Sequence, residues 1–409
     1  MLAAPVISVA PAGSPPARTL GLAALARLTL DAEALTRVWG ELVARFEASG
    51  FDAGALFDIA TLLLATGQRE KGLELQAAAL EVCRQYRRPA PGGAPELRLL
   101  VICAAGDLMA NTPVDFLLEG SRVEPVWWFV DGPPDPALAP PHDVALIGIS
   151  ESPQADGLLH RLQGAFEAWP APVLNNRPAL IAGLTRDGVA ARFAGHAHIL
   201  APTTVRASRE AMAAAAAGGS LSGLAAGLEF PVIVRPIGSQ AGVGLERLAN
   251  PADLAAYLAG RSETAFFVAR FIDYAGPDGL YRKYRVAFIG GRPFISHMAV
   301  SPRWMIHYLN ADMAENPANR AEEAAVMAGF EAGFAHRHAA AFAALNAAYP
   351  LDYWAIDCAE APDGRLLLFE ADTAMIVHAM DPADVYPYKQ PAMARLFAAF
   401  VAELAKAAA

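Results

Sequence analysis

The chain has 409 residues, of which 55% are hydrophobic and 18% charged, and its formal net charge is −10 with an isoelectric point near 5.4. This length suits two or three globular domains, the acidic balance disfavours nucleic acid as a partner, and no run of about 18 apolar residues predicts a membrane span. Three widely spaced cysteines, Cys83, Cys103 and Cys358, offer neither a disulfide framework nor a zinc motif. Since Met1–Ala10 lacks the basic flank of a secretory signal, we expect a cytoplasmic protein.

The first 90 residues are expected to form a short arm followed by helices. Residues 1–20 are rich in Pro, Ala and Gly without a lasting period, which predicts a flexible arm. Over residues 21–90 apolar side chains recur at helical spacing, and Ala55–Cys83 has the form of a helix, a turn at Gly67 and a second helix. This hairpin resembles one tetratricopeptide unit, through Leu56, Ile59, Ala60, Leu63, Gly67, Gly72, Ala79 and Leu80. Because such repeats are normally stable only as about three copies, plain packing and a protein partner both stay open for it.

An α/β domain is predicted over residues 95–182, after a Pro- and Gly-rich linker at Pro89–Pro95. Apolar runs predict strands at Leu97–Ala104, Val126–Val130, Val144–Ile149 and Pro172–Leu174. Helices are expected at Pro113–Leu118 and Leu158–Trp169. This alternation of strand and helix is typical of an α/β layer.

The remainder, residues 183–409, has an antiparallel α+β pattern. Strands are predicted at Phe230–Arg235, Ala265–Phe271, Tyr284–Phe288, Arg292–Val300, Trp354–Ala359 and Leu366–Glu370. Helices are predicted over Arg320–Ala348 and from Pro391 onward.

The segment Pro231–Arg247 has the composition of a phosphate-binding loop. A strand with Arg235 at its end is followed by Gly238, Gly242 and Gly244, and glycines let backbone N–H groups approach phosphate oxygens closely. The loop is neither a Walker motif nor a dinucleotide fingerprint. By itself it fits an ordinary hairpin loop equally well.

Three carboxylates near the C-terminus suggest a metal platform. Asp357 interrupts one apolar strand, and Glu370 and Asp372 end the next. Magnesium prefers carboxylate oxygens together with water and phosphate, and a buried acid without a cation is costly, so we favour a metal over a solvated strand end.

Other polar residues lie between these two segments. The strand Phe266–Asp273 offers backbone to an adenine edge and Asp273 to a ribose hydroxyl. Lys283 and Arg285 share one face of the next strand and can meet phosphate or carboxylate charge there, although a charged edge strand is the plainer interpretation. Downstream, Arg303, His307 and Asn310 form a polar, aromatic loop whose spacing fixes no role, and His297 and His378 fit structural roles.

The order of cation strand, glycine loop, hinge strand, basic strand and Asp…Glu-x-Asp resembles the ATP-grasp family, which includes carboxylate–amine ligases. The resemblance covers roughly residues 97–400. It implies a preceding substrate-side α/β domain, here 95–182, and a nucleotide-binding domain of two α+β subdomains, here 183–409, with the helical hairpin as an addition. Asn175–Asp187 resembles the start of the nucleotide-binding part, and Pro202, Thr203 and Thr204 its short strand exit.

The resemblance also implies roles for single residues toward ATP. Arg235 and Arg186 stand where the family has phosphate-binding lysines, and Gly238 to Gly244, with Ser239 and Gly242, would form the mobile lid. Phe267 and Val268 would lie along the adenine hinge, and Lys283 would face the phosphates.

For magnesium, the resemblance implies Asp357, Glu370 and Asp372 as ligands. Asp372 replaces the customary asparagine, and the two arginines replace lysines, which keeps each sign of charge but alters geometry and leaves nucleotide preference open.

The implied reaction is ATP-dependent joining of a substrate carboxylate to an amine through an acyl phosphate, with Arg285 or Arg303 stabilising the tetrahedral oxyanion. The substrates would be small-molecule or peptide carboxylates and amines. Two alternatives stay open: a phosphotransferase of the same fold, and an inactive nucleotide-binding module that presents the hairpin to a partner. The sequence leaves the oligomeric state open too, with a homodimer as one alternative.

Overall fold

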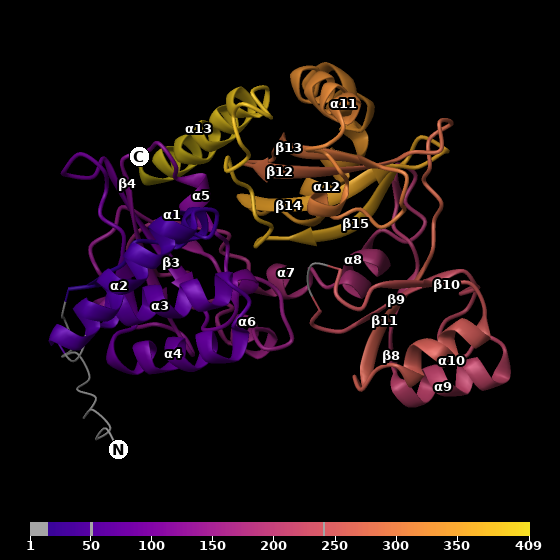
Figure 1. Ribbon diagram of the computed structural model, residues 1–409, viewed down its shortest axis with the longest axis horizontal. Coiled ribbons are helices and arrows are strands. Elements are labelled where there is room, and N and C mark those ends of the chain that lie inside the picture. The colour runs from indigo at the N-terminus through magenta and orange to yellow at the C-terminus, as the bar shows by residue number, and fades with distance from the viewer. Residues whose placement is uncertain (1–14, 50–51, 240–241) are drawn as a thin grey trace.

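The computed structural model describes residues 15–49, 52–239 and 242–409, and this part of the chain contains three β-sheets (Figure 1). In Figure 1 the first sheet and its helices form one lobe, and the other two sheets lie beside it, one above the other. The predicted combination of an α/β layer with α+β parts is confirmed.

The first sheet has six strands in the order β1-β2-β4-β3-β5-β6. They are β1 (Ala17–Arg18), β2 (Gln85–Arg87), β3 (Leu97–Cys103), β4 (Val123–Phe129), β5 (Val144–Ile147) and β6 (Val173–Leu174). The neighbours of β3 run parallel to it, and β3 and β5 are almost fully buried, as their continuous apolar runs predict. Its short helices are η1 (Leu108–Ala110), α5 (Val114–Leu117), η2 (Pro136–Leu138), α6 (Asp156–Arg161) and α7 (Pro178–Ala182). The helix predicted over Leu158–Trp169 is too long. The observed helix α6 ends at Arg161, before Gly164, whose φ of 80° is not helical.

The predicted N-terminal arm is wrong for its last residues. β1 pairs in parallel with β2, and Thr19 and Leu20 both donate hydrogen bonds to Asp58. These bonds hold residues 17–20 on the sheet and on α3. Residues 1–14 of the expected arm lie outside the described residues.

Four helices follow, and two of them form the predicted hairpin. They are α1 (Leu22–Leu28), α2 (Ala32–Ser49), α3 (Ala53–Ala65) and α4 (Arg69–Val82). Gly67 makes the turn with φ of 81°, and a Cβ on Gly72 would lie 2.7 Å from Leu64 Cγ, so only glycine lets α3 and α4 approach this closely. The hairpin is confirmed, whereas its likeness to a tetratricopeptide unit stays a prediction.

The helical region and the α/β layer share one hydrophobic core, so the division expected near residue 90 does not separate two units. Ala79 and Tyr86 pack in the same cluster as Val101 of β3 and Leu146 of β5. The last helix, α13 (Lys389–Ala408), adds Phe400 and other residues to this cluster from the far end of the chain. Burial of apolar side chains thereby joins the helical region and the α/β layer to the last helix of the chain.

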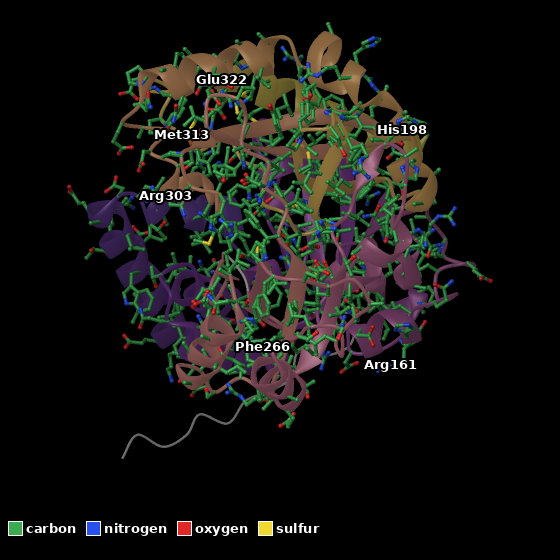
Figure 2. All side chains as sticks on the ribbon, turned by 90° about the vertical axis from the view of Figure 1, so that its right-hand side faces the viewer. Arg161, His198, Phe266, Arg303, Met313 and Glu322 are labelled. Atoms are coloured by element: carbon green, nitrogen blue, oxygen red, sulfur yellow. The ribbon has the colours of Figure 1, made fainter. Side chains whose placement is uncertain are left out.

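A small antiparallel sheet has the order β10-β9-β11-β8. Its strands are β8 (Thr204–Ser208), β9 (Val232–Pro236), β10 (Glu246–Leu248) and β11 (Ala265–Arg270). The helices α9 (Arg209–Gly218) and α10 (Pro251–Ala259) pack on one face around Phe266, which Figure 2 labels. The other face is left toward the third sheet.

The third sheet has the order β13-β12-β14-β15-β7, with antiparallel neighbours except for β15 and β7. Its strands are β7 (Ile199–Leu200), β12 (Tyr281–Ile289), β13 (Arg292–Ser301), β14 (Tyr353–Glu360) and β15 (Leu366–Asp372). Its helices are α8 (Arg186–Arg192), α11 (Pro317–Ala328) and α12 (Ala339–Ala348), with the 3₁₀ turn η3 (Tyr308–Asn310) in the loop after β13. The single helix predicted over Arg320–Ala348 is wrong: α11 ends at Ala328, before Gly329, and a π-helical turn, η4 (Glu331–Ala335), separates it from α12.

Candidate active site

A cavity of about 380 Å³ lies between the small sheet and the third sheet. Strands from both sheets line it: Arg235 lies on β9, Lys283 and Arg285 on β12, Asp357 on β14, and Glu370 and Asp372 on β15. Side chains alternate across a strand, so residues two apart, such as Lys283 and Arg285, share one face. The register supplies the rest, because Arg285 is paired with Asp357 and Asp357 with Glu370. The sheets thus bring together six residues that the sequence predicts for this site.

Asp357 is the most buried residue of this group, and two cations contact its carboxylate. Lys283 Nζ donates to Asp357 Oδ2 at 2.7 Å, while Arg285 Nε donates to Oδ1 at 2.8 Å and its Nη2 to Oδ2 at 3.0 Å. Burial alone would raise the pKa of Asp357, but Arg285 and Lys283 hold that pKa well below its usual range. Burial would lower the pKa of Arg285, and contact with Asp357 raises it instead. Asp357 and Arg285 are therefore both charged at neutral pH.

Arg186 and Arg235 add positive charge at the neighbouring side of the cavity. Arg186, in the first turn of α8, forms an ion pair with Glu370. Arg235 is 8% exposed and donates to the Oγ and the backbone oxygen of Ser239. Burial, with the nearby charge of Arg186, lowers the pKa of Arg235 to about 10, so its guanidinium stays protonated. A buried, fixed cation in a cavity favours an anionic ligand.

The carboxylate of Asp372 is buried, and its hydrogen bonds do not offset the effect of burial on its pKa. Burial raises its pKa to about 7, and the negative charges of Glu370 and Glu151 act in the same direction. Glu151 belongs to the loop after β5, and burial raises its pKa as well. A cation near Asp372 would lower the cost of ionising it.

The three carboxylates predicted as magnesium ligands differ in how free their oxygens are. In the described ranges no group of three or more His, Cys, Asp or Glu side chains is arranged to hold a metal ion. Both oxygens of Asp357 are engaged by cations, whereas Glu370 is paired with Arg186 through Oε1, and Glu370 and Asp372 face the cavity with carboxylate oxygens of the kind magnesium prefers. Glu370 and Asp372 therefore fit a metal ion that also binds phosphates. The site of three carboxylates stays a prediction, and Asp357 does not fit it in this arrangement because cations occupy both of its oxygens.

The predicted adenine hinge needs a correction. β11 is hydrogen-bonded to β8 on one side and β9 on the other, so its backbone is not free for a ligand. Phe267 lines the cavity, but Val268 points to the opposite face, into the core of the small domain. Asp273 is exposed and accepts a hydrogen bond from Ala275 N, outside the cavity lining. Arg270, the last residue of β11, reaches the cavity, as do Phe271, Ile272 and Tyr274 after it.

The glycine loop joins β9 to β10 as an antiparallel hairpin and still reaches the cavity through Gly242. Gly238, Gly242 and Gly244 all have φ between 70° and 79°, which few other residues adopt. A Cβ on Gly244 would lie 2.7 Å from Pro236 Cδ, so this position also requires glycine for space. Residues 240–241 of the predicted lid lie outside the described residues.

The loop after β13 covers the cavity with Trp304, His307 and Asn310. Burial, together with Lys283 and Arg285, lowers the pKa of His307, which keeps it neutral. Arg303, labelled in Figure 2, is exposed, donates to Asn310 O and Asp312 Oδ2, and does not line this cavity. The oxyanion role predicted for Arg303 is therefore not supported by its position.

Sequence reasoning missed several residues of the site. Met109, in the α/β layer, lines the cavity, and Met375 and Ile376 line it after β15. They are apolar residues in the short helix η1 and in the segment after β15, with no spacing that distinguishes them from core residues, so nothing in the sequence could have identified them.

A cavity between two α+β sheets, preceded in the chain by a largely parallel α/β layer, is the arrangement that the sequence resemblance to the ATP-grasp family implied.

No family model matches the sequence, and a search of curated proteins finds no match. Among solved structures, the chain is similar to the VanG D-Ala:D-Ser ligase from Enterococcus faecalis, at 14% identity and a TM-score of 0.44 over 76% of this chain and 99% of that one. The ATP-complexed D-alanine–D-alanine ligase from Bacillus anthracis matches at 13% identity and a TM-score of 0.45, over 76% and 97%. A RimK domain ATP-grasp protein from Sphaerobacter thermophilus matches at 15% identity and a TM-score of 0.42, over 75% and 99%. In the described residues, no helix is both long and apolar enough to span a membrane.

Proposed function

We propose that this ATP-grasp-like protein is an ATP-dependent ligase that activates a substrate carboxylate and joins it to an amine. The main support is the group of charged residues that line one cavity, with Arg235 from the small sheet and Lys283, Arg285, Glu370 and Asp372 from the third sheet. A cavity of about 380 Å³ with an apolar part, which includes Phe267 and Phe271, and a cationic part suits a nucleotide with its phosphates.

In the proposed reaction a carboxylate oxygen of the substrate attacks the γ-phosphorus of ATP, and ADP leaves. Arg235 and Lys283 neutralise charge that develops on the phosphate oxygens, and Arg285 holds the Asp357 carboxylate in place. The amine then attacks the acyl carbon and loses a proton, and inorganic phosphate leaves. Glu370 and Asp372 would hold magnesium, which supplies further charge neutralisation when bound.

The test measures ADP and phosphate release with amino acids and short peptides as carboxylate and amine donors. The ligase proposal expects release that needs both substrates, and transfer of oxygen-18 from the labelled carboxylate to phosphate. Arg235→Met should lower turnover roughly hundredfold, the effect of removing one preorganised charge donor.

Two outcomes would contradict the proposal. A stable phosphorylated product without an amine requirement would indicate a phosphotransferase. ATP binding without turnover for any donor pair would indicate a nucleotide-binding module.

A further inference from the structure

Asp357 differs from the other acids of the cavity because cationic side chains already occupy both of its oxygens. Its side chain is 4% exposed and accepts hydrogen bonds from Lys283 Nζ, Arg285 Nε and Arg285 Nη2 at 2.7, 2.8 and 3.0 Å. A divalent ion on this carboxylate would have to displace one of these cations or approach them at a distance where like charges repel strongly.

We propose that the ammonium group of Lys283 is the resident cation of Asp357, in the position where the sequence predicts a divalent ion, and that it binds a phosphate oxygen of the nucleotide directly. This inference rests on the proposed nucleotide-binding function. It goes further by assigning charge neutralisation at Asp357 to a side chain and metal binding to Glu370 and Asp372 alone.

The two cations have different tasks because their contacts differ. Arg285 is fixed at three points: Nε and Nη2 donate to Asp357, and Nη1 donates to Ile376 O at 3.0 Å. An ammonium has three N–H donors, and within the described part of the chain Lys283 Nζ donates to Asp357 only. Lys283 also lines the cavity, so its other donors are available to a ligand. Arg285 therefore positions Asp357, while Lys283 connects Asp357 to the ligand.

If Lys283 is the cation at Asp357, ATP binding should depend only in part on magnesium. Nucleotide binding should weaken without divalent ions but not be lost, because Lys283 and Arg235 still meet the phosphates. A site that relied on metal at Asp357 would lose ATP once the metal was chelated.

The first experiment measures ATP binding by calorimetry in magnesium and in EDTA. For the wild-type chain we expect EDTA to weaken binding by about tenfold or less, and for Lys283→Met we expect a further loss of about tenfold or more in EDTA. Lys283→Arg should keep most of the metal-free affinity. The matched control is Arg282→Met. Arg282 directly precedes Lys283 on β12, and it pairs with Asp278 and Glu322 away from the cavity.

The double variant Lys283→Met/Asp357→Asn separates ligand binding from simple charge balance. If Lys283 only neutralised Asp357, removing both charges would restore ATP binding to the wild-type level, and this result would overturn the inference. We expect binding to stay weak. Thermal melting of each variant establishes that it is folded, and the double variant avoids a buried carboxylate without its lysine.

The second experiment counts bound Mn²⁺ in the ATP complex by electron paramagnetic resonance. Asp357→Asn should leave the number and affinity of bound ions unchanged within about twofold, whereas Glu370→Gln should weaken them by about tenfold. Equal weakening by both variants would overturn the inference and leave the proposed function standing. A wild-type chain that binds no ATP under any condition would contradict both.

Discussion

Asp58 is a fully buried acid in the helical region. It is 0% exposed and accepts hydrogen bonds from Thr19 Oγ1 and Leu20 N, which tie β1 to α3. Burial raises its pKa to about 7, and these hydrogen bonds offset the rise only in part. The folded chain therefore binds a proton at Asp58 over a pH range in which the unfolded chain has released it.

Stability should consequently fall as pH rises from about 4 to about 7 and become level above that, as far as Asp58 contributes. The folded state binds more protons in this window, so the free energy of unfolding decreases with pH, by at most about 1.4 kcal/mol per unit of pKa shift. Asp58→Asn keeps an acceptor for Leu20 N and removes the titration. Urea unfolding at several pH values should show a smaller decline for Asp58→Asn than for the wild-type chain; equal declines would contradict the assignment.

At the scale of single residues, the sequence predicts which side chains share a strand face but not which partners they meet. The spacing of Lys283 and Arg285, and that of Glu370 and Asp372, is enough to place each pair on one side of its strand. That Asp357 lies opposite Arg285 depends on the register between β14 and β12, which 71 residues of intervening chain do not reveal. Because of this register Asp357, which the sequence predicts as a metal ligand, forms an ion pair with Arg285.

Among the elements, the loop that covers the cavity depends on a buried polar network beneath it. Lys389 Nζ contacts Tyr308 Oη, Asp381 Oδ2 at 3.1 Å and Glu323 Oε1 at 3.4 Å, and Lys389 and Glu323 are 2% and 0% exposed. Glu323 also accepts hydrogen bonds from Met298 N and Tyr308 Oη, each at 3.0 Å. The network therefore joins α13, α11 and β13 to the loop that contains His307 and Asn310.

Removing one partner of this network should be much more costly than removing the pair. Lys389→Met leaves Glu323 buried without its cation and should lower the free energy of unfolding by roughly 3–5 kcal/mol. Adding Glu323→Gln should recover part of that loss. Glu322→Gln is the matched control, because the neighbouring Glu322 makes a partly exposed pair with Arg282 and should cost about 1 kcal/mol or less. Chemical denaturation checks the order, and equal losses for Lys389→Met and Glu322→Gln would contradict it.

Elements with a strong local pattern were predicted well, and those defined by packing were not. β3 and the α3–α4 hairpin follow from an apolar run and from helical spacing around Gly67. β1, β2 and β8 are short or polar strands, and the strands to which they are hydrogen-bonded lie far away in the sequence. The break between α11 and α12 was missed because the alanine-rich sequence around Gly329 and Gly333 keeps high helix propensity on both sides.

At the scale of the whole molecule, the site depends on how the α/β layer is held against the third sheet. Asn175, directly after β6, is 1% exposed and has a φ of 54°, a left-handed conformation that asparagine tolerates. Its Oδ1 accepts from Asp352 N at 2.8 Å and Tyr353 N at 3.0 Å, and its Nδ2 donates to Tyr353 O at 2.8 Å. One side chain thereby fixes the start of β14, the strand that contains Asp357, to the end of the first sheet.

Asn175→Gly should test this connection without adding backbone strain, because glycine adopts a positive φ freely. The substitution leaves the buried N–H group of Tyr353 and the part-buried N–H group of Asp352 without their acceptor, and we expect a loss of roughly 2–4 kcal/mol in the free energy of unfolding. Asn346→Gly is the control, since Asn346 also donates from its amide to a backbone oxygen, that of Gly291 at 2.7 Å, but at the surface of α12. Its cost should not exceed about 1 kcal/mol, the helix propensity of glycine. If urea unfolding gives the same loss for both variants, the connection at Asn175 does not hold the α/β layer to the third sheet. A larger loss for Asn175→Gly, with both sheets still unfolding in one transition, would mean that the two layers are stabilised as one cooperative unit.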